Sequence, residues 1–218
     1  PAIVSGIGKK SQIFAEELLK IISKKGVISM SSLEAAESEK LFEGVYRDVN
    51  IALANELSDF CKSTSTNYWE IIKATNSQPF CHLHYPGTGV GGLCIPVYPQ
   101  FVINSAKKFN VSTKLIEFAR EINDTMPKKC ANESLKLIKK SKSKKMKIAV
   151  LGLSFRGDVY DSRLSPTYSV VDIFLKKGFQ VAVHDPFIKN DDLLPKNVIL
   201  SQNLSEIVKN ASLIFIST

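Results

Sequence analysis

The chain of 218 residues has little of what several classes of protein depend on. Its four cysteines, Cys61, Cys81, Cys94 and Cys130, form no Cys-x-x-Cys pair, which argues against a structural zinc site and against a disulfide framework. No apolar run approaches the roughly 20 residues needed to cross a bilayer, and the sequence shows no signal-peptide pattern. We therefore expect no metal and no membrane segment, with the cytoplasm as the default location.

The chain carries a formal net charge of +8, but the excess of basic residues is local. Six lysines lie from position 139 to position 147, and no aromatic residue interrupts them to offer a stacking surface for bases. We interpret this run as a solvated linker between two domains and expect no nucleic-acid partner. A hydrophobic content of 44% and a charged content of 23% are typical of a globular protein with an ordinary core.

The most informative local feature is the glycine-rich segment 85–96, with the sequence YPGTGVGGLCIP. Its four glycines let the backbone turn sharply and lie close to a ligand, and Cys94 follows at once. Three of them satisfy the Gly-x-Gly-x-x-Gly fingerprint, but dinucleotide binding also needs a buried strand before the glycines and a helix directly after them. No apolar alternation precedes this segment, and Pro96 and Pro99 follow it. The sequence predicts a rigid loop that presents Cys94, and not a phosphate-binding loop.

Hydrophobic periodicity indicates three successive parts. Residues 1–30 hold a helical stretch between two short strand-like runs, as at the end of an α/β domain. Residues 31–140 show helical stripes, and residues 146–218 alternate strands with helices, which is typical of a parallel sheet covered by helices. The sequence therefore predicts an α/β protein with a helical centre. We expect central helices at 32–61, 66–76, 99–109 and 113–140, later strands at 148–153, 179–184 and 213–216, and later helices at 166–177 and 204–209.

The glycine-rich segment resembles the active-site loop of nucleotide-sugar 6-dehydrogenases, and within them the branch that acts on UDP-N-acetylhexosamines. Three other segments resemble family blocks in the family's order and spacing: 40–57 (KLFEGVYRDVNIALANEL), 119–127 (AREINDTMP) and 149–166 (AVLGLSFRGDVYDSRLSP).

This resemblance implies a role for each part of the chain. Residues 1–30 would be the end of an NAD-binding Rossmann domain that is mostly missing, and 31–140 a central helical domain that dimerises and carries the active-site loop. Residues 146–218 would be an incomplete Rossmann-like domain that binds the UDP-sugar.

The resemblance also implies a chemistry, in which two successive hydride transfers to NAD oxidise the C6 alcohol of a UDP-sugar to a carboxylate. Cys94 would add to the intermediate aldehyde, and the resulting thiohemiacetal would be oxidised to a thioester that water hydrolyses. Lys40 would stabilise the substrate oxyanion, and Arg163 would contact NAD. The implied substrate-binding residues are Tyr85, Gly87, Gly89, Gly91, Phe155 and Arg156.

Four positions depart from the family's pattern. Gly44 replaces an asparagine that shares oxyanion stabilisation with the lysine, and Tyr98 replaces an aspartate that serves thioester hydrolysis. Leu93 and Phe80 stand where a histidine and a substrate-binding arginine are usual. These departures favour an alternative function, a catalytically degraded relative that keeps the nucleotide-sugar pocket and the helical dimer core as a binding or assembly module.

Overall fold

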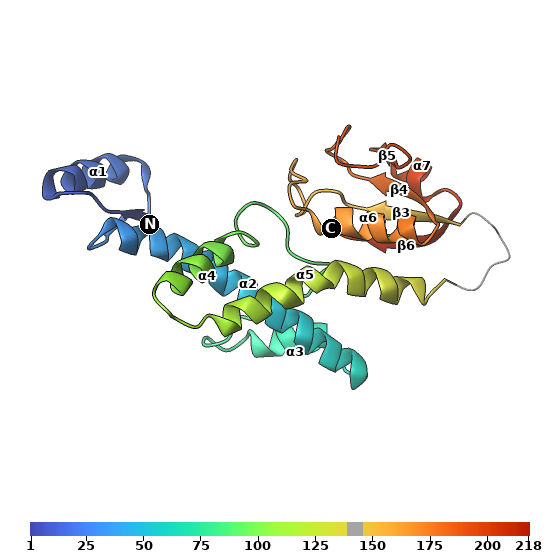
Figure 1. The fold of residues 1–218 in the computed structure, drawn as a ribbon, viewed down its shortest axis with the longest axis horizontal. Coiled ribbons are helices and arrows are strands. Elements are labelled where there is room, and N and C mark those ends of the chain that lie inside the picture. Colours follow the sequence, from blue (N-terminus) through green and yellow to red (C-terminus); the bar gives the residue numbers. More distant parts are fainter. Residues whose placement is uncertain (139–145) are drawn as a thin grey trace.

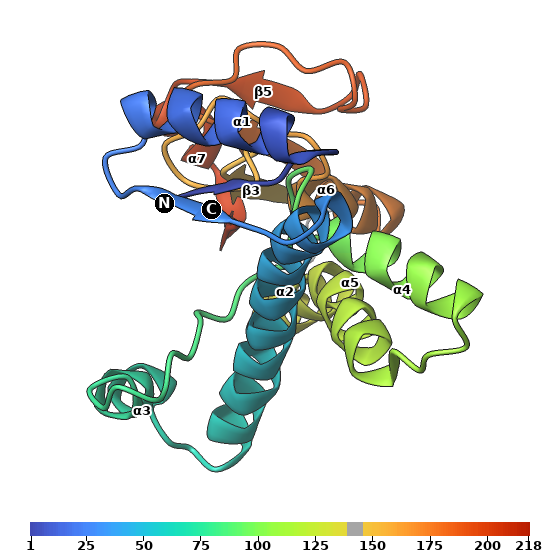
Figure 2. The same cartoon turned by 90° about the vertical axis from the view of Figure 1, so that its left-hand side faces the viewer.

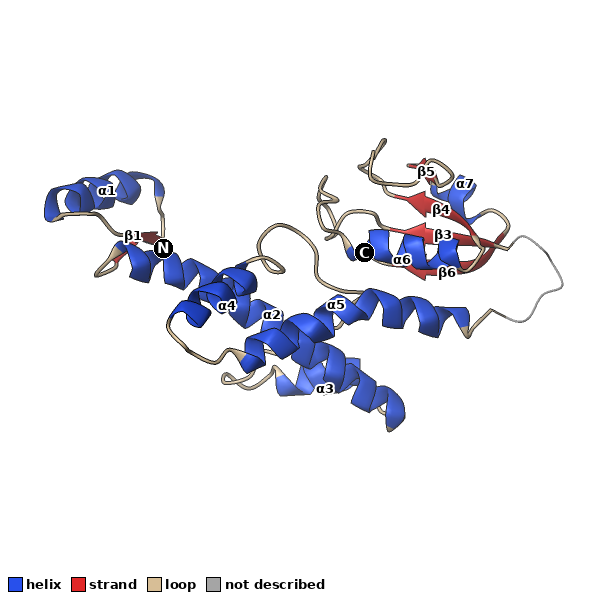
Figure 3. Ribbon diagram, in the orientation of Figure 1, coloured by secondary structure: helices blue, strands red, loops and turns tan. Residues whose placement is uncertain are grey.

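A computed structural model describes residues 1–138 and 146–218, whose helices and strands form three groups along the chain (Figure 1). A small α/β unit lies at one end, a helical centre follows, and a second sheet lies at the other end (Figure 3). Of the run 139–147, interpreted above as a linker, residues 139–145 lie outside the described residues and Lys147 is the first residue of a strand. No helix of the described residues has both the length and the hydropathy of a membrane span.

The N-terminal unit consists of β1 (Ala2–Val4), α1 (Lys9–Ile22) and β2 (Val27–Ser29), with β1 and β2 paired in parallel. These elements match the predicted strand, helix and strand. Helix α1 buries none of its residues, so large apolar side chains such as Phe14 and Ile21 remain exposed in the described chain.

The helical centre is built on α2 (Leu33–Ser63), a single long helix that leaves the N-terminal unit (Figure 2). It begins where predicted, because the Ser32 hydroxyl caps it by accepting a hydrogen bond from the Ala35 amide at 3.1 Å. The remaining central helices are α3 (Tyr68–Thr75), α4 (Tyr98–Lys108) and α5 (Lys114–Leu135). Helix α5 is shorter than the periodicity predicts, since turns follow Leu135.

A buried chain of polar side chains, here called the polar ladder, joins α2, α5 and the glycine loop. The Gly87 amide donates to Asn55 Oδ1 at 2.9 Å, and Asn55 Nδ2 donates to Asn123 Oδ1 at 3.1 Å. Asn123 Nδ2 donates in turn to Asp48 Oδ1 at 2.9 Å, and Arg120 donates to the same oxygen at 2.5 Å. All four residues that contribute side chains to the ladder are buried, with at most 4% of their surface exposed. The ladder therefore fixes the start of the glycine loop to both helices.

The C-terminal sheet is entirely parallel, with the strand order β5-β4-β3-β6. Its core strands are apolar on both faces, and Ile148, Val150 and Val183 are fully buried. The edge strand β5 was not predicted, because it has only three residues and none of them is buried. The elements in chain order are β3 (Lys147–Leu151), α6 (Pro166–Lys176), β4 (Gln180–His184), β5 (Ile199–Ser201), α7 (Leu204–Val208) and β6 (Ala211–Ile216).

Asp185, at the end of β4, holds the loop that follows β3. One of its carboxylate oxygens accepts hydrogen bonds from the amides of Leu153 and Ser154, both at 2.9 Å, and from the Ser154 hydroxyl at 3.1 Å. Burial would raise the pKa of Asp185, but the backbone amides that donate to it outweigh burial and hold the pKa below its ordinary value. The ionised carboxylate thus fixes the segment that leads directly into Phe155.

The ladder predicts a large difference between two substitutions on one helix. Asn55→Leu should lower the free energy of unfolding by about 2–4 kcal/mol, because Asn123 Oδ1 would lose its partner in a buried place and the Gly87 amide would lose its bond to α2. Asn50→Leu is the matched control, since Asn50 bonds only the Tyr46 carbonyl of its own helix. It should change stability by less than about 1 kcal/mol. Urea unfolding followed by circular dichroism measures both, and equal losses would show that the ladder has no special role.

Candidate active site

The glycine loop packs directly against the loop that follows β3. Gly92 has φ +84°, and a Cβ atom there would lie 2.9 Å from the Phe155 ring. A Cβ atom at Gly91 would lie 2.5 Å from Phe155 Cβ, so a side chain at either position would push the two loops apart. The Gly92 amide also donates to the Arg163 carbonyl at 2.9 Å. These positions therefore need glycine because the two loops approach each other closely.

A cavity of about 320 Å³ lies where the two loops meet α2. It brings together five of the predicted site residues, Gly89, Gly91, Cys94, Phe155 and Arg156. The rest of its lining consists of Arg47, Ile51, Val90, Leu93 and Ile95.

Two lining residues on α2, Arg47 and Ile51, did not emerge from the sequence reasoning. They lie three and seven positions after Gly44, and residues with such spacing share one face of a helix. Helical periodicity counted from Lys40 and Gly44 could have found them. Arg47 adds a second guanidinium to the cavity beside Arg156.

Cys94 presents an exposed thiol one turn before α4. Its carbonyl accepts hydrogen bonds from the amides of Val97 at 3.1 Å and Tyr98 at 2.8 Å, which closes a helical turn. Cys94 and Tyr98 therefore lie on the same face of this turn. The nearby Cys94 side chain is the main cause of the raised pKa of Tyr98. Pro99 in the first turn of α4 is tolerated because the first amides of a helix need no partner within it.

Lys40 lies on the face of α2 that approaches this turn. Its ammonium pairs with Glu43 at 2.7 Å, and this hydrogen bond is the main reason that the pKa of Lys40 is raised. The phenol of Tyr98 adds a smaller contribution in the same direction, so the two groups are close enough to interact. Both side chains of the pair are more than half exposed, at 61% and 55%. Lys40 therefore lies at the surface, in an ion pair that solvent can reach.

Four predicted site residues lie outside the 320 Å³ cavity: Lys40, described above, and Tyr85, Gly87 and Arg163. Tyr85 stacks on Trp69, with ring centroids 5.7 Å apart, and remains 68% exposed. Gly87 belongs to the polar ladder. Arg163 is held by Asp161 through hydrogen bonds of 2.9 and 2.6 Å, which are the main cause of its raised pKa.

Three of the four cysteines are less accessible than Cys94. Cys61 is buried, whereas Cys81 and Cys130 are half-buried. Burial raises the pKa of Cys130, which disfavours its thiolate. Exposure and position thus single out Cys94 as the thiol that a ligand in the cavity can meet.

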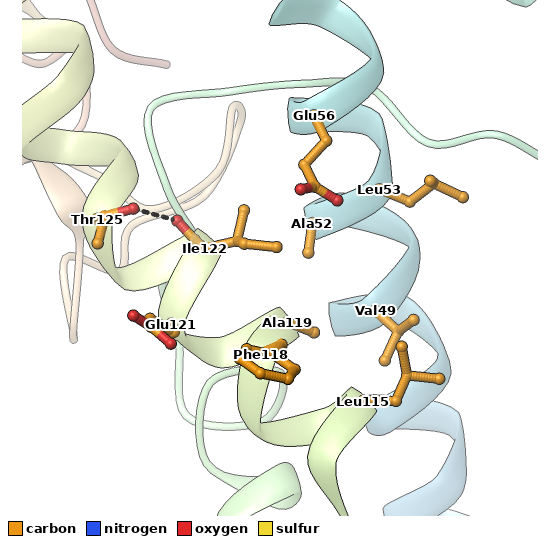
Figure 4. Close-up of a pocket in the computed structure, with 10 residues that line it drawn as sticks. All are labelled: Val49, Ala52, Leu53, Glu56, Leu115, Phe118, Ala119, Glu121, Ile122 and Thr125. Atoms are coloured by element: carbon orange, nitrogen blue, oxygen red, sulfur yellow. Dashed lines mark hydrogen bonds between the residues drawn. The ribbon is translucent and has the colours of Figure 1, made fainter.

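A larger, apolar groove of about 640 Å³ runs between α2 and α5 (Figure 4). Leu53, Leu115 and Phe118 project into it and remain 41%, 69% and 60% exposed. None of the predicted site residues lines this groove. The remaining lining residues are Val49, Ala52, Glu56, Ala119, Glu121, Ile122 and Thr125.

Two segments of the chain match the same family of enzymes. Residues 34–125 match the central domain of the UDP-glucose/GDP-mannose dehydrogenase family, and residues 149–218 match the UDP binding domain of that family.

Two UDP-N-acetyl-D-mannosamine dehydrogenases align with most of this chain. A UDP-N-acetyl-D-mannosamine dehydrogenase of Methanococcus maripaludis is 39% identical over 184 residues, which make up 84% of this chain and 42% of that protein. Another, of Campylobacter jejuni, is 38% identical over 211 residues, or 94% of this chain and 50% of that protein. The chain spans about half the length of the curated relatives it matches.

Solved structures confirm the predicted α/β fold. A UDP-D-ManNAc dehydrogenase from Pyrococcus horikoshii matches with a TM-score of 0.84 and 33% identity over 99% of this chain and 49% of that chain. An NDP-N-acetyl-D-galactosaminuronic acid dehydrogenase from Methanosarcina mazei matches with a TM-score of 0.86 and 31% identity over 99% of this chain and 47% of that chain. Since two successive domains of one family match in order and the fold agrees throughout, the chain belongs to the UDP-glucose/GDP-mannose dehydrogenase family.

Proposed function

We propose that this chain is the central and sugar-binding part of a cytoplasmic, NAD-dependent UDP-N-acetylhexosamine 6-dehydrogenase. The observation that carries the proposal is the exposed Cys94 thiol in a cavity walled by the glycine loop, Phe155 and Arg156. Relatives named as UDP-N-acetyl-D-mannosamine dehydrogenases support the choice of substrate. The substrate would be UDP-N-acetylmannosamine or a similar UDP-sugar, oxidised at C6 to the uronate.

The phosphates and sugar of the substrate would lie along the cavity. Arg156 and Arg47 offer two guanidinium groups, and guanidinium groups bind phosphate oxygens through paired hydrogen bonds. Gly89 and Gly91 also line the cavity, and the sugar would lie against their backbone. Tyr85 and Gly87, at the start of the loop, would contact the substrate at its outer end. In this arrangement C6 of the sugar lies next to Cys94.

Cys94 would act as the nucleophile on the C6 aldehyde. The sulfur lone pair forms the C–S bond, and the π electrons of the carbonyl group move onto its oxygen. Lys40, exposed on α2, would stabilise the negative charge that develops on this oxygen. Loss of a hydride would turn the adduct into a thioester, and hydrolysis would release the carboxylate and regenerate the thiol.

NAD would accept the two hydrides of the overall oxidation. The described residues do not by themselves build a site for it: the only glycine fingerprint of the sequence lies in the loop beside Cys94, which no strand precedes and no helix immediately follows. Arg163 would be a contact from this chain, once released from Asp161. The unit of residues 1–30 would be the end of the domain that holds NAD.

We further propose that the chain forms a homodimer through the apolar groove between α2 and α5. An exposed apolar groove of this kind is unfavourable in water and is typical of interaction surfaces. The groove is continuous along two long helices, so a second copy could bury the same residues reciprocally.

Gly44 and Tyr98 favour a second candidate function, a nucleotide-sugar-binding or assembly module without turnover. Gly44 has no side chain that could help Lys40 stabilise an oxyanion, and a phenol is a poor general base at neutral pH. The reactivity of Cys94 distinguishes the two functions.

The enzyme function predicts selective chemistry at Cys94. Iodoacetamide at neutral pH should label Cys94 first, because the other three thiols are buried or half-buried, and UDP-N-acetylmannosamine should slow this labelling at least about tenfold. Peptide mass spectrometry measures both effects, with Cys81 as the internal control that the sugar should leave unchanged. Slow labelling of Cys94 that no UDP-sugar affects would favour the assembly module.

The dimer predicts a response to charge in the groove. Phe118→Glu should convert the chain to monomers at tens of micromolar, because a carboxylate would be buried without a partner. Leu193→Glu is the control, since Leu193 is 71% exposed and does not line the groove. Sedimentation velocity measures the outcome, and a monomeric unmodified chain at the same concentration would refute the dimer.

A further inference from the structure

Gly44 and Tyr98 fit each other across two helices. A Cβ atom at Gly44 would lie 2.6 Å from Tyr98 Cδ2 and 2.9 Å from Tyr98 Cβ, both closer than real atoms approach. Gly44 is buried in the middle of α2, where glycine destabilises a helix relative to alanine. The close approach of Tyr98 explains why glycine stands at position 44. The missing side chain at position 44 makes the space that the Tyr98 ring occupies.

This packing directs the phenol toward the reacting groups. Cys94 and Tyr98 share one face of the first turn, joined by the backbone hydrogen bond of 2.8 Å. Lys40 and Gly44 share the facing side of α2, four residues apart. The Tyr98 ring therefore packs on Gly44, on a turn that it shares with Cys94 and beside the face of α2 that carries Lys40.

On the basis of the proposed function, we propose that Tyr98 is a catalytic residue that donates a hydrogen bond to the oxyanion formed when Cys94 adds to the C6 aldehyde. It acts beside Lys40, in place of the donor that position 44 lacks. Cys94 reacts as the thiolate, so that a sulfur lone pair forms the C–S bond, the π pair of the carbonyl moves to oxygen, and the phenol keeps its proton throughout.

The raised pKa of the Tyr98 phenol suits a hydrogen-bond donor and makes the phenol a poor general base. The neighbouring Cys94 side chain raises the pKa of Tyr98 above the ordinary value of about 10, so the hydroxyl stays protonated at neutral pH. A neutral donor held in place stabilises developing negative charge without reorganising. Hydrolysis of the thioester must then rely on a base other than Tyr98.

The test compares the affinity of the 218-residue chain for two ligands, UDP-N-acetylmannosamine and its 6-aldehyde, by calorimetry. The aldehyde should bind more tightly, because only it can form a bond with Cys94. Tyr98→Phe keeps the ring against Gly44 and should reduce this preference about tenfold, with the affinity for the alcohol unchanged within about twofold. Cys94→Ala should abolish the preference, and Tyr46→Phe, a tyrosine on α2 outside the cavity, should preserve it.

Gly44→Ala tests the packing. The added methyl group should displace the ring and reduce the preference as much as Tyr98→Phe does, with circular dichroism confirming the fold. Because both changes remove the same interaction, the double variant should lose no more than either single variant. Retention of the full preference in Tyr98→Phe would overturn the role of Tyr98 alone. Failure of the unmodified chain to bind either ligand would overturn the proposed function, and the role of Tyr98 with it.

Discussion

The site depends on one contact, the hydrogen bond that the Gly87 amide donates to the buried Asn55 side chain. A glycine-rich loop has little side-chain packing of its own and would lose much entropy on being fixed. Asn55 ties the loop to α2, and the rest of the polar ladder ties α2 to α5. The buried Arg120–Asp48 pair at the end of the ladder must keep its partners, because either charge alone would be costly in this place.

Local patterns predicted most of the helices and strands. Ser32 caps α2 as expected, and the buried strands β3 and β4 follow from continuous apolar runs. The apolar run at 213–216 also forms a strand, β6, but this strand buries only Phe215 and leaves Ile214 and Ile216 exposed. The short strand β5 carries too few residues for a pattern. The end of α5 was predicted too late, because polar residues after Leu135 continue a plausible helical sequence while the chain turns.

The site was predictable only in part, for a geometrical reason. Motifs identify residues that lie near one another in the chain, such as the loop glycines and Cys94. They do not reveal that Arg47 and Ile51 face the same cavity from a different element. Nor does the sequence reveal that Gly44 and Tyr98 touch. In the sequence, each looks like the separate loss of one polar side chain of the family's pattern. Contact across 54 positions is a property of the fold, and only coordinates connect the two.

The hydrogen bonds that Asp185 accepts from the loop after β3 affect how the fold responds to acid. A carboxylate whose pKa is lowered by folding stabilises the folded state above the unfolded pKa of about 3.9, and this contribution disappears as the pH falls through the lower folded value. The amides of Leu153 and Ser154 would then face a protonated carboxyl group, which accepts hydrogen bonds poorly. The wall of the cavity that carries Phe155 is thus insensitive to pH across the physiological range and is released only by strong acid.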